Sequence, residues 1–422
     1  MRFMNATPAH RPPMSLTARA VSTLVIPLLA PGTRRRALTD ITLALVKSIL
    51  IVRLDGIGDM VLTSPFLREL RRNAPGALIT LIVKPETRNL VEFCPYVNEV
   101  LVFDWRDFGP LSELWRLAGT AVFARKHLRV RFDLAVLPRW GADFYQETFL
   151  AYFSGAPCRV AYSEFSNEPK ARLNRGYDRL LTRPLEGAGP KHQVEWNLDF
   201  LLSLGGNIVD KRLELWLTED DRCFARQALA ARAVREGEVL IAFAPGAGAK
   251  KRCWPVERWI ELGRRLHCEF GPRIVLLGGK AEGDFGARIE RELSGIAINL
   301  MGQLTLRQTG AILENCSLTV SNDSGPMHLA AAAGSGVVEI SCHPRGGDPD
   351  HANSPVHFHP WGVPRDVLQP EPAAPSCSGS CTFCVPHCIL GIEVATVQQA
   401  VRKLLARICA GNLERGTAAH AD

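Results

Sequence analysis

The sequence predicts an α/β protein with two parallel-sheet domains. The chain has 422 residues, of which 46% are hydrophobic and 22% are charged, and a chain of this length and ordinary composition seldom folds around one core. Short apolar segments alternate with helical patterns in its first half, and the same alternation starts again after a glycine-rich break near residue 206. These observations together predict two domains of similar architecture.

The first series of elements begins at residue 48. Residues 49–54 form a short apolar run, followed by the loop Asp55-Gly56-Ile57-Gly58-Asp59 and a helical pattern through Arg72. Three further strand-like runs, separated by helical stretches, lie at residues 78–83, around 100–103 and at 134–137. Repeated alternation of strands and helices predicts a parallel sheet covered by helices on both faces.

The second series repeats this pattern. A helical stretch at 195–204 ends at Gly205-Gly206-Asn207, and a short linker leads to about Asp220. Three strands and three helices are then predicted, at 239–244, 257–267, 274–277, 283–293, 318–320 and after Pro326. Ligands of open parallel sheets bind outside the carboxyl ends of the strands, so we expect a central cleft between two Rossmann-like domains.

Four segments are expected along the chain: an N-terminal extension (1–47), a first Rossmann-like domain (48–215), a second (216–390), and a C-terminal helix and tail (391–422). The extension contains an apolar run at 20–30 that is too short to span a bilayer, and the triplet Arg34-Arg35-Arg36 behind it opposes export. We therefore expect a poorly ordered or membrane-surface extension on a cytoplasmic protein.

Composition disfavours two classes of protein. The formal net charge of +7 is spread along the chain, which favours a small acidic substrate or an anionic surface over nucleic acid. Most of the 12 cysteines stand singly, which is typical of buried thiols in a reducing compartment and not of a disulfide-rich secreted domain.

The loop at 245–255 of the second domain is suited to a diphosphate. Gly246 permits close approach of the backbone, Lys251 and Arg252 can neutralise phosphate oxygens, and Pro255 starts the next helix. The alternative is a solvated basic loop. The position of the cations between a buried strand and a helix N-terminus favours a binding role.

Two further loops can contact the same ligand. At 321–328 a helix begins with small residues, so its exposed N–H groups suit an anion, although Asp323 or Ser324 can instead cap the helix. His328 in the first turn has no capping role, which favours a contact with a phosphate or leaving group. The loop at 278–282 places Glu282 where a ribose can be held, but a solvated glutamate is the common alternative.

Asp59 is the candidate catalytic residue of the first domain. A carboxylate directly after Gly58 can take a proton from an attacking hydroxyl, but it can equally cap the following helix. A dinucleotide oxidoreductase is disfavoured, because the glycine fingerprint that starts at Gly56 fails at Val61 and Lys84-Pro85 follows the second strand in place of an acidic ribose ligand.

Read together, these loops resemble glycosyltransferase family 9, the ADP-heptose lipopolysaccharide heptosyltransferases. The resemblance runs from about Ser48 to about Leu405, and its four most specific motifs lie at 49–65, 245–255, 299–306 and 322–330. It implies the GT-B fold, in which the first domain binds the acceptor and the second binds the nucleotide sugar. It also implies an inverting, metal-independent transfer of heptose from ADP-heptose.

The resemblance also implies roles for particular residues. Asp59 matches the base that activates the acceptor hydroxyl. The residues expected to bind the nucleotide sugar are Gly58, Gly246, Lys251, Arg252, Glu282, Met301, Gly302, Asp323, Ser324, Gly325 and His328. One departure is that Arg252 stands where the family usually has a lysine, two residues before Trp254-Pro255, with Lys251 next to it.

The partners implied by the resemblance are a nucleotide-sugar donor and a glycolipid or glycan acceptor of the cell envelope, such as lipopolysaccharide core. Such an enzyme works in the cytoplasm at the inner face of the membrane. Two alternatives are a different donor, such as a UDP-sugar, and a non-catalytic sugar-nucleotide-binding protein. The presence of both Asp59 and His328 disfavours the second alternative.

Four cysteines near the C-terminus form the cluster Cys377-x3-Cys381-x2-Cys384-x3-Cys388. Their number and spacing suit a tetrahedral zinc or an iron site. The first three copy the spacing of radical enzymes, but they follow a proline-rich loop and do not open a barrel. A structural zinc or iron and a set of free thiols both stay open, and no cofactor is expected for catalysis.

Overall fold

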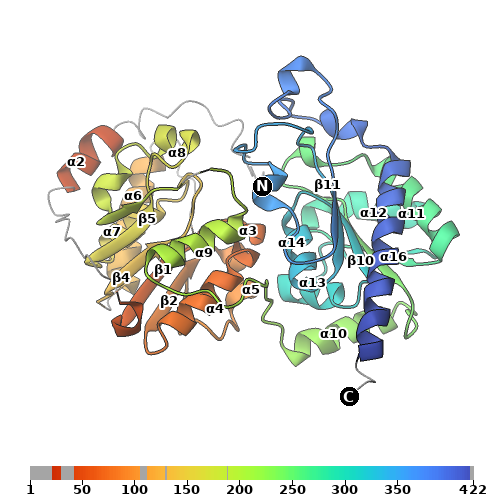
Figure 1. Cartoon of the computed structure of the whole chain (residues 1–422), viewed down its shortest axis with the longest axis horizontal. Helices are drawn as coiled ribbons and strands as arrows, with labels where there is room; N and C mark the ends of the chain where they lie inside the picture. Colours follow the sequence, from red (N-terminus) through yellow and green to blue (C-terminus); the bar gives the residue numbers. More distant parts are fainter. Residues whose placement is uncertain (1–20, 30–41, 105–111, 129–130, 188, 419–422) are drawn as a thin grey trace. The chain divides into compact units, whose positions relative to one another are not determined.

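The computed structural model describes residues 21–29, 42–104, 112–128, 131–187 and 189–418 (Figure 1). The chain divides into two compact α/β units, and the division falls between Lys211 and Arg212. We call them the N-terminal domain and the C-terminal domain.

The N-terminal domain is built on a six-stranded parallel sheet with the strand order β3-β2-β1-β4-β5-β6. Its strands are β1 Ser48–Val52, β2 Leu78–Val83, β3 Glu99–Val102, β4 Leu134–Leu137, β5 Cys158–Tyr162 and β6 Arg183–Leu185. Every residue of the central strand β1 is buried, because the sheet is covered on both of its faces.

Helices connect these strands in sequence. They are α3 Ile57–Val61, α4 Ser64–Asn73, α5 Arg88–Val91, α6 Ser112–His127, α7 Glu147–Phe153, α8 Glu168–Leu173 and α9 Gln193–Ser203, with the short 3-10 turns η4 Leu43–Leu45, η5 Pro85–Thr87 and η7 Tyr177–Leu180. Helix α4 packs against α9, and α6 packs against α7. With right-handed crossovers between parallel strands, these two pairs cover opposite faces of the sheet.

Part of the predicted N-terminal extension packs onto this domain. Residues Val21–Val25 (η2) and Ile26–Leu29 (α2) are helical, and the buried side chains of Val21 and Ile26 contact Phe149 and Leu180. The rest of the extension before Thr42 lies outside the described residues. None of the helices in the described part of the chain is long and apolar enough to cross a membrane.

The C-terminal domain has a second six-stranded parallel sheet, with the order β12-β11-β10-β7-β8-β9. Its strands are β7 Leu240–Ala244, β8 Arg273–Leu276, β9 Ala297–Asn299, β10 Leu318–Asn322, β11 Gly336–Ile340 and β12 Arg365–Leu368. Counted from β7, this order is the same as in the N-terminal domain, which is the Rossmann order.

The helices of the C-terminal domain form two groups. Helix α11 packs against α12 and α16, whereas α13 packs against α10 and α14. The elements are α10 Glu219–Ala230, α11 Val256–Phe270, α12 Gly283–Glu292, α13 Leu306–Leu313, α14 Gly325–Ala332, α15 Pro355–Phe358 and α16 Val394–Ala418, with η8 Lys250–Arg252, η9 Lys280–Glu282, η10 Pro375–Cys377 and η11 Cys388–Gly391. In Figure 1 the long C-terminal helix α16, in dark blue, runs along the sheet.

The predicted fold class, α/β with two Rossmann-like domains, is confirmed. The single helix expected through Arg72 is two helices, α3 and α4. Pro65 lies in the first turn of α4, where its missing N–H is tolerated, and it would disrupt a helix that continued through this position. Five strands, β5, β6, β9, β11 and β12, were not among the predicted elements.

Candidate donor-binding and catalytic sites

Each sheet has one point where the strand order reverses, and ligands of such sheets bind at that point. In the N-terminal domain it lies between β1 and β4, and in the C-terminal domain it lies between β7 and β10. The loops that follow these four strands contain most of the candidate residues. We describe the two domains separately.

Asp59 lies in the first turn of α3, directly after β1. Its carboxylate Oδ2 accepts a hydrogen bond from the Gly56 N–H at 3.3 Å, and its Oδ1 lies 3.9 Å from Arg53 Nη2. The side chain keeps 30% of its surface exposed, so the helix-capping contact leaves the carboxylate accessible. The pKa of Asp59 is raised by partial burial and by the charge of Asp55, against the opposing effect of Arg53 and Arg139.

A buried group of charged side chains supports Asp59. Arg53 Nε lies 2.9 Å from Asp55 Oδ2, and Arg139 pairs with both Asp55 and Glu147. Glu147 also accepts a hydrogen bond from the Leu54 N–H at 2.7 Å. The pKa of Glu147 is raised by burial and by Asp55. Because buried charges are costly unless they are paired, this group fixes the loop between β1 and α3.

In the C-terminal domain, one asparagine joins the loops that follow β7 and β10. Asn322 Nδ2 donates to the Pro245 carbonyl at 2.6 Å, and Asn322 Oδ1 accepts from the Trp254 N–H at 3.3 Å. Arg252 Nη1 lies 3.1 Å from Asp323 Oδ2, and the side chains of this pair are only 16% and 10% exposed. The two loops are therefore held together by buried polar contacts at the switch point.

The loops after β8 and β9 meet beside them. A Cβ atom added to Gly246 would lie 2.9 Å from Glu282 Cγ, so these two residues are in direct contact. Gly302 donates its N–H to the Gly278 carbonyl at 2.9 Å and has a φ of +69°, which favours glycine. The Met301 side chain lies against Gly278 and Gly286.

Helix α14 presents its first turn at this edge of the sheet. Ser324 is its N-cap residue, but its side chain makes no capping hydrogen bond, so the N–H groups of the first turn are not capped by it. His328 is 3% exposed, and its Nδ1 has no hydrogen-bond partner among the described residues. Burial lowers the pKa of His328 to about 4, so its imidazole is neutral near pH 7.

Comparison with known proteins identifies the family. The sequence pattern of glycosyltransferase family 9 (heptosyltransferase) matches residues 145–340. Lipooligosaccharide heptosyltransferase 2 of Haemophilus ducreyi is 28% identical over 296 residues, which are 67% of this chain and 79% of that protein. This match and this relative confirm the predicted resemblance to glycosyltransferase family 9.

Two solved structures have a similar fold. The family 9 glycosyl transferase from Veillonella parvula superposes with a TM-score of 0.70 at 22% identity, over 86% of this chain and 98% of that one. The Escherichia coli ADP-heptose lps heptosyltransferase II has a TM-score of 0.62 at 21% identity, over 85% and 99% of the two chains. The fold of this glycosyltransferase is GT-B, as its sequence predicts.

The match to family 9 includes most of the donor residues predicted in this glycosyltransferase. Gly246, Glu282, Met301 and Gly302 are gathered at the ends of β7, β8 and β9, and Arg252, Asp323, Ser324, Gly325 and His328 lie at the ends of β7 and β10. Gly58 lies with Asp59 in α3 of the N-terminal domain. This helix precedes the matched residues, which begin at residue 145.

Lys251 is placed differently from its neighbour Arg252. Its side chain is 3% exposed, and its ammonium Nζ donates to the Cys381 carbonyl at 2.8 Å.

The cysteine cluster differs from its predicted composition. His387 lies with Cys377, Cys381 and Cys388 as the fourth possible ligand, whereas Cys384 is exposed and lies outside that group.

The charged residues around Asp59 are not among the site residues that the sequence predicts. Arg139 follows β4 and Glu147 begins α7, so both are distant from Asp59 in sequence. The available signal was that Arg139 lies two residues after the end of β4, the strand that pairs with β1 at the switch point. Arg53 and Asp55 lie within the predicted motif at 49–65 and form the rest of the group.

Substitution of Gly246 by alanine is expected to weaken binding of the nucleotide roughly tenfold, which corresponds to about 1.4 kcal/mol. The new methyl group would lie 2.9 Å from Glu282 Cγ and 3.1 Å from Oε1, so the carboxylate must move. Gly283→Ala is the matched control, because a Cβ there meets nothing within 4 Å. Calorimetric titration with ADP measures both, and equal affinities of the two variants would contradict the expectation.

The low pKa of His328 predicts a loss of stability in acid. The unfolded chain binds a proton on this imidazole from about pH 6.5 downward, but the folded protein does not until about pH 4. The free energy of unfolding therefore falls across this window, by up to about 3 kcal/mol from this residue. In denaturant titrations His328→Gln should lose less stability than the parent between pH 6.5 and 4. Replacement of the exposed His127 by Gln is the control for loss of an imidazole.

Proposed function

We propose that the protein transfers a heptose from ADP-heptose to a hydroxyl group of a lipopolysaccharide core acceptor, with inversion at the anomeric carbon. The observation that carries this proposal comes from the C-terminal domain, at the edge of the sheet where the strands end. There, Arg252, the uncapped first turn of α14 and the Gly246–Glu282 contact meet at one switch point. A cation and helix N–H groups suit a diphosphate, and a carboxylate suits ribose hydroxyls.

In the proposed reaction, Asp59 takes the proton from the acceptor hydroxyl as its oxygen attacks the anomeric carbon of the donor. The new C–O bond forms while the bond between that carbon and the diphosphate oxygen breaks, and ADP leaves. A single displacement of this kind inverts the anomeric configuration. The raised pKa of Asp59 makes its carboxylate a better proton acceptor than an ordinary aspartate.

The negative charge that develops on the leaving ADP requires stabilisation. Arg252 and the first-turn N–H groups of α14 supply it in this proposal, so no metal ion is assigned to the chemical step. Neutral His328 contributes through hydrogen bonding and not through charge, because its pKa is about 4. Its buried Nδ1, which lacks a partner in the described part of the chain, is the atom available for this contact.

The donor and acceptor assignments draw on the relatives. The Escherichia coli protein of similar fold is an ADP-heptose lps heptosyltransferase, and the Haemophilus ducreyi relative is a lipooligosaccharide heptosyltransferase. Both names support a core glycolipid as the acceptor here. Because nucleotide sugars are cytoplasmic, we place the reaction at the inner face of the cytoplasmic membrane.

A donor panel tests the proposal. Thermal unfolding of the purified protein is measured with ADP, ADP-heptose, UDP and a UDP-sugar, each also with Gly246→Ala. We expect ADP and ADP-heptose to raise the Tm of the parent and to raise that of Gly246→Ala less at the same concentration. Stabilisation by the UDP compounds alone would show that the donor base is wrongly assigned.

A further inference from the structure

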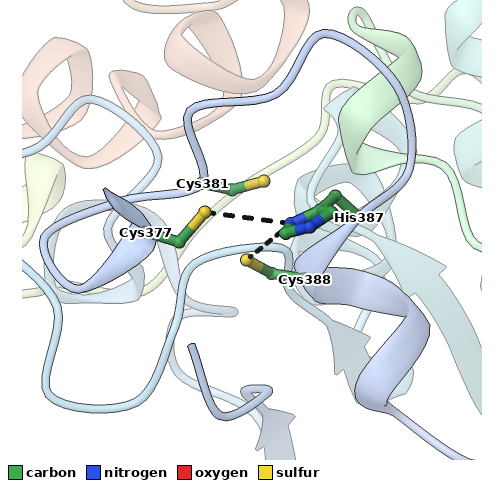
Figure 2. Close-up of side chains that lie close together, drawn as sticks. All are labelled: Cys377, Cys381, His387 and Cys388. Atoms are coloured by element: carbon green, nitrogen blue, oxygen red, sulfur yellow. Dashed lines mark hydrogen bonds between the residues drawn. The ribbon is translucent and has the colours of Figure 1, made fainter. Parts of the chain in front are cut away.

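Three cysteines and one histidine form a compact group in the segment between β12 and α16. Cys377 ends η10, Cys388 begins η11, and Cys381 and His387 lie between them, as Figure 2 shows. One ligand atom of each residue lies within 4.8 Å of all the others. His387 Nδ1 is 3.8 Å from Cys377 Sγ and 3.6 Å from Cys388 Sγ.

These separations suit a tetrahedral metal site. A tetrahedron with Zn–S bonds of about 2.3 Å and Zn–N bonds of about 2.0–2.1 Å has S···N edges of about 3.6 Å and S···S edges of about 3.8 Å. The two measured S···N distances are close to this value. The group therefore needs only a small contraction to enclose a zinc ion.

The packing around these cysteines differs from that around ordinary core cysteines. Cys377, Cys381 and Cys388 are 0%, 3% and 0% exposed, yet Ala374 is the one aliphatic side chain packed against them among the residues described. Cys342, in contrast, lies within the large aliphatic core of the C-terminal domain. The three thiols are thus gathered around one another, and hydrophobic packing does not explain that arrangement.

Lys251 provides an independent observation. Its ammonium is buried and donates to the Cys381 carbonyl at 2.8 Å, and no carboxylate of the described ranges lies within 4.0 Å of it. A buried cation needs a negative partner. A divalent metal bound by three thiolates and a neutral imidazole has a net negative charge, which supplies this partner beside Cys381.

We propose that Cys377, Cys381, His387 and Cys388 bind a structural zinc ion that supports the loop at 245–255, here called the donor loop. Four protein ligands close the coordination sphere, which is typical of a structural and not a catalytic zinc site. Phe383 stacks on His387 with ring centroids 3.8 Å apart and holds its imidazole in place.

The connection to the donor loop runs through hydrogen bonds to this segment. Besides Lys251, Trp254 Nε1 donates to the Ile392 carbonyl at 2.9 Å, and Arg258 Nη1 donates to the same carbonyl at 2.7 Å. Lys251 and Trp254 belong to the same loop as Arg252, and Arg258 lies in the first turn of α11, which follows that loop, so the zinc ion positions the loop that carries this cation. This positioning role depends on the proposed donor site, whereas zinc binding does not.

Metal analysis of the full-length protein, purified from zinc-supplemented cells, tests zinc binding. We expect about one zinc ion per chain in the parent and in Cys384→Ser, which changes the exposed cysteine outside the group, and at least a tenfold lower content in Cys381→Ser. Stoichiometric iron in place of zinc, or zinc loss from Cys384→Ser equal to that from Cys381→Ser, would overturn the assignment.

Cobalt substitution keeps the test decisive if Cys381→Ser does not fold. The parent protein, refilled with Co²⁺ after zinc removal, should show thiolate-to-cobalt charge transfer and the visible bands of a tetrahedral site, and the absence of both would overturn the proposal. For the positioning role, Lys251→Met should raise the KM for the donor more than it changes kcat. If zinc binds but this KM does not change, the positioning role fails and the metal site stands; if ADP does not bind the parent, the proposed function fails separately.

Discussion

Replacement of Asp59 by asparagine is expected to lower kcat about 10²- to 10⁴-fold, the usual contribution of a general base. The KM for the donor should stay unchanged, because the donor contacts that carry the proposal, Arg252, the first turn of α14 and the Gly246–Glu282 pair, lie in the C-terminal domain. Asparagine keeps the shape of the side chain and can still accept a hydrogen bond from the Gly56 N–H, so the fold should be retained. Steady-state kinetics with both substrates varied separates these effects.

The control for Asp59→Asn is Asp220→Asn, which also changes an acidic residue in the first turn of a helix but on an exposed surface. It should transfer at the parental rate. The pH dependence gives a second readout. The pKa of Asp59 is raised above the ordinary value of 3.8. On acidification, the parent should therefore lose kcat/KM at a higher pH than it would if its base had an ordinary pKa. Parental activity in Asp59→Asn would exclude this residue as the base.

Replacement of Arg252 by glutamine is expected to lower kcat/KM for the donor about 10- to 100-fold. A hydrogen bond to a charged group contributes about 1.5–3 kcal/mol, and here it forms with a diphosphate that gains charge as it leaves. The substitution also removes the cation that pairs with buried Asp323, so part of its effect can arise from an unpaired carboxylate.

A double-mutant cycle with Asp323→Asn separates these two causes. If Arg252 contacts phosphate, the double variant should remain about as weak toward the donor as Arg252→Gln. If Arg252 serves only to neutralise Asp323, the double variant should recover most of the lost activity. Arg264→Gln is the surface control, because its pairing with Glu292 is solvent-exposed and contributes little.

The fold could be predicted where strands are long apolar runs. Residues such as Ile49 to Val52 and Ile79 to Val83 are buried on both faces of a sheet, so the hydrophobic signal is continuous. Strands β9 and β6 have only three residues, and β12 mixes charged and apolar residues with an exposed start. Such short outer strands give too little periodic signal for prediction from a single sequence.

The candidate donor residues could be predicted because glycine, proline and capping residues act locally. The environment of Asp59 could not, because Arg139 and Glu147 reach it only through the pairing of β4 with β1. The inward orientation of the Lys251 side chain could not be predicted either. Two adjacent lysines have the same local pattern, and only the packing of a distant cysteine segment directs Lys251 inward. The same packing places His387, and not the predicted Cys384, as the fourth possible metal ligand.

The most direct test of the account is a transfer assay with ADP-heptose and a core glycolipid acceptor that lacks the added heptose. Mass spectrometry follows the acceptor while released ADP is quantified in the same reaction. We predict that the parent enzyme adds one heptose to the acceptor for each ADP released and that Asp59→Asn forms neither product at a comparable rate. Transfer from a UDP-sugar, with no product from ADP-heptose, would contradict the account.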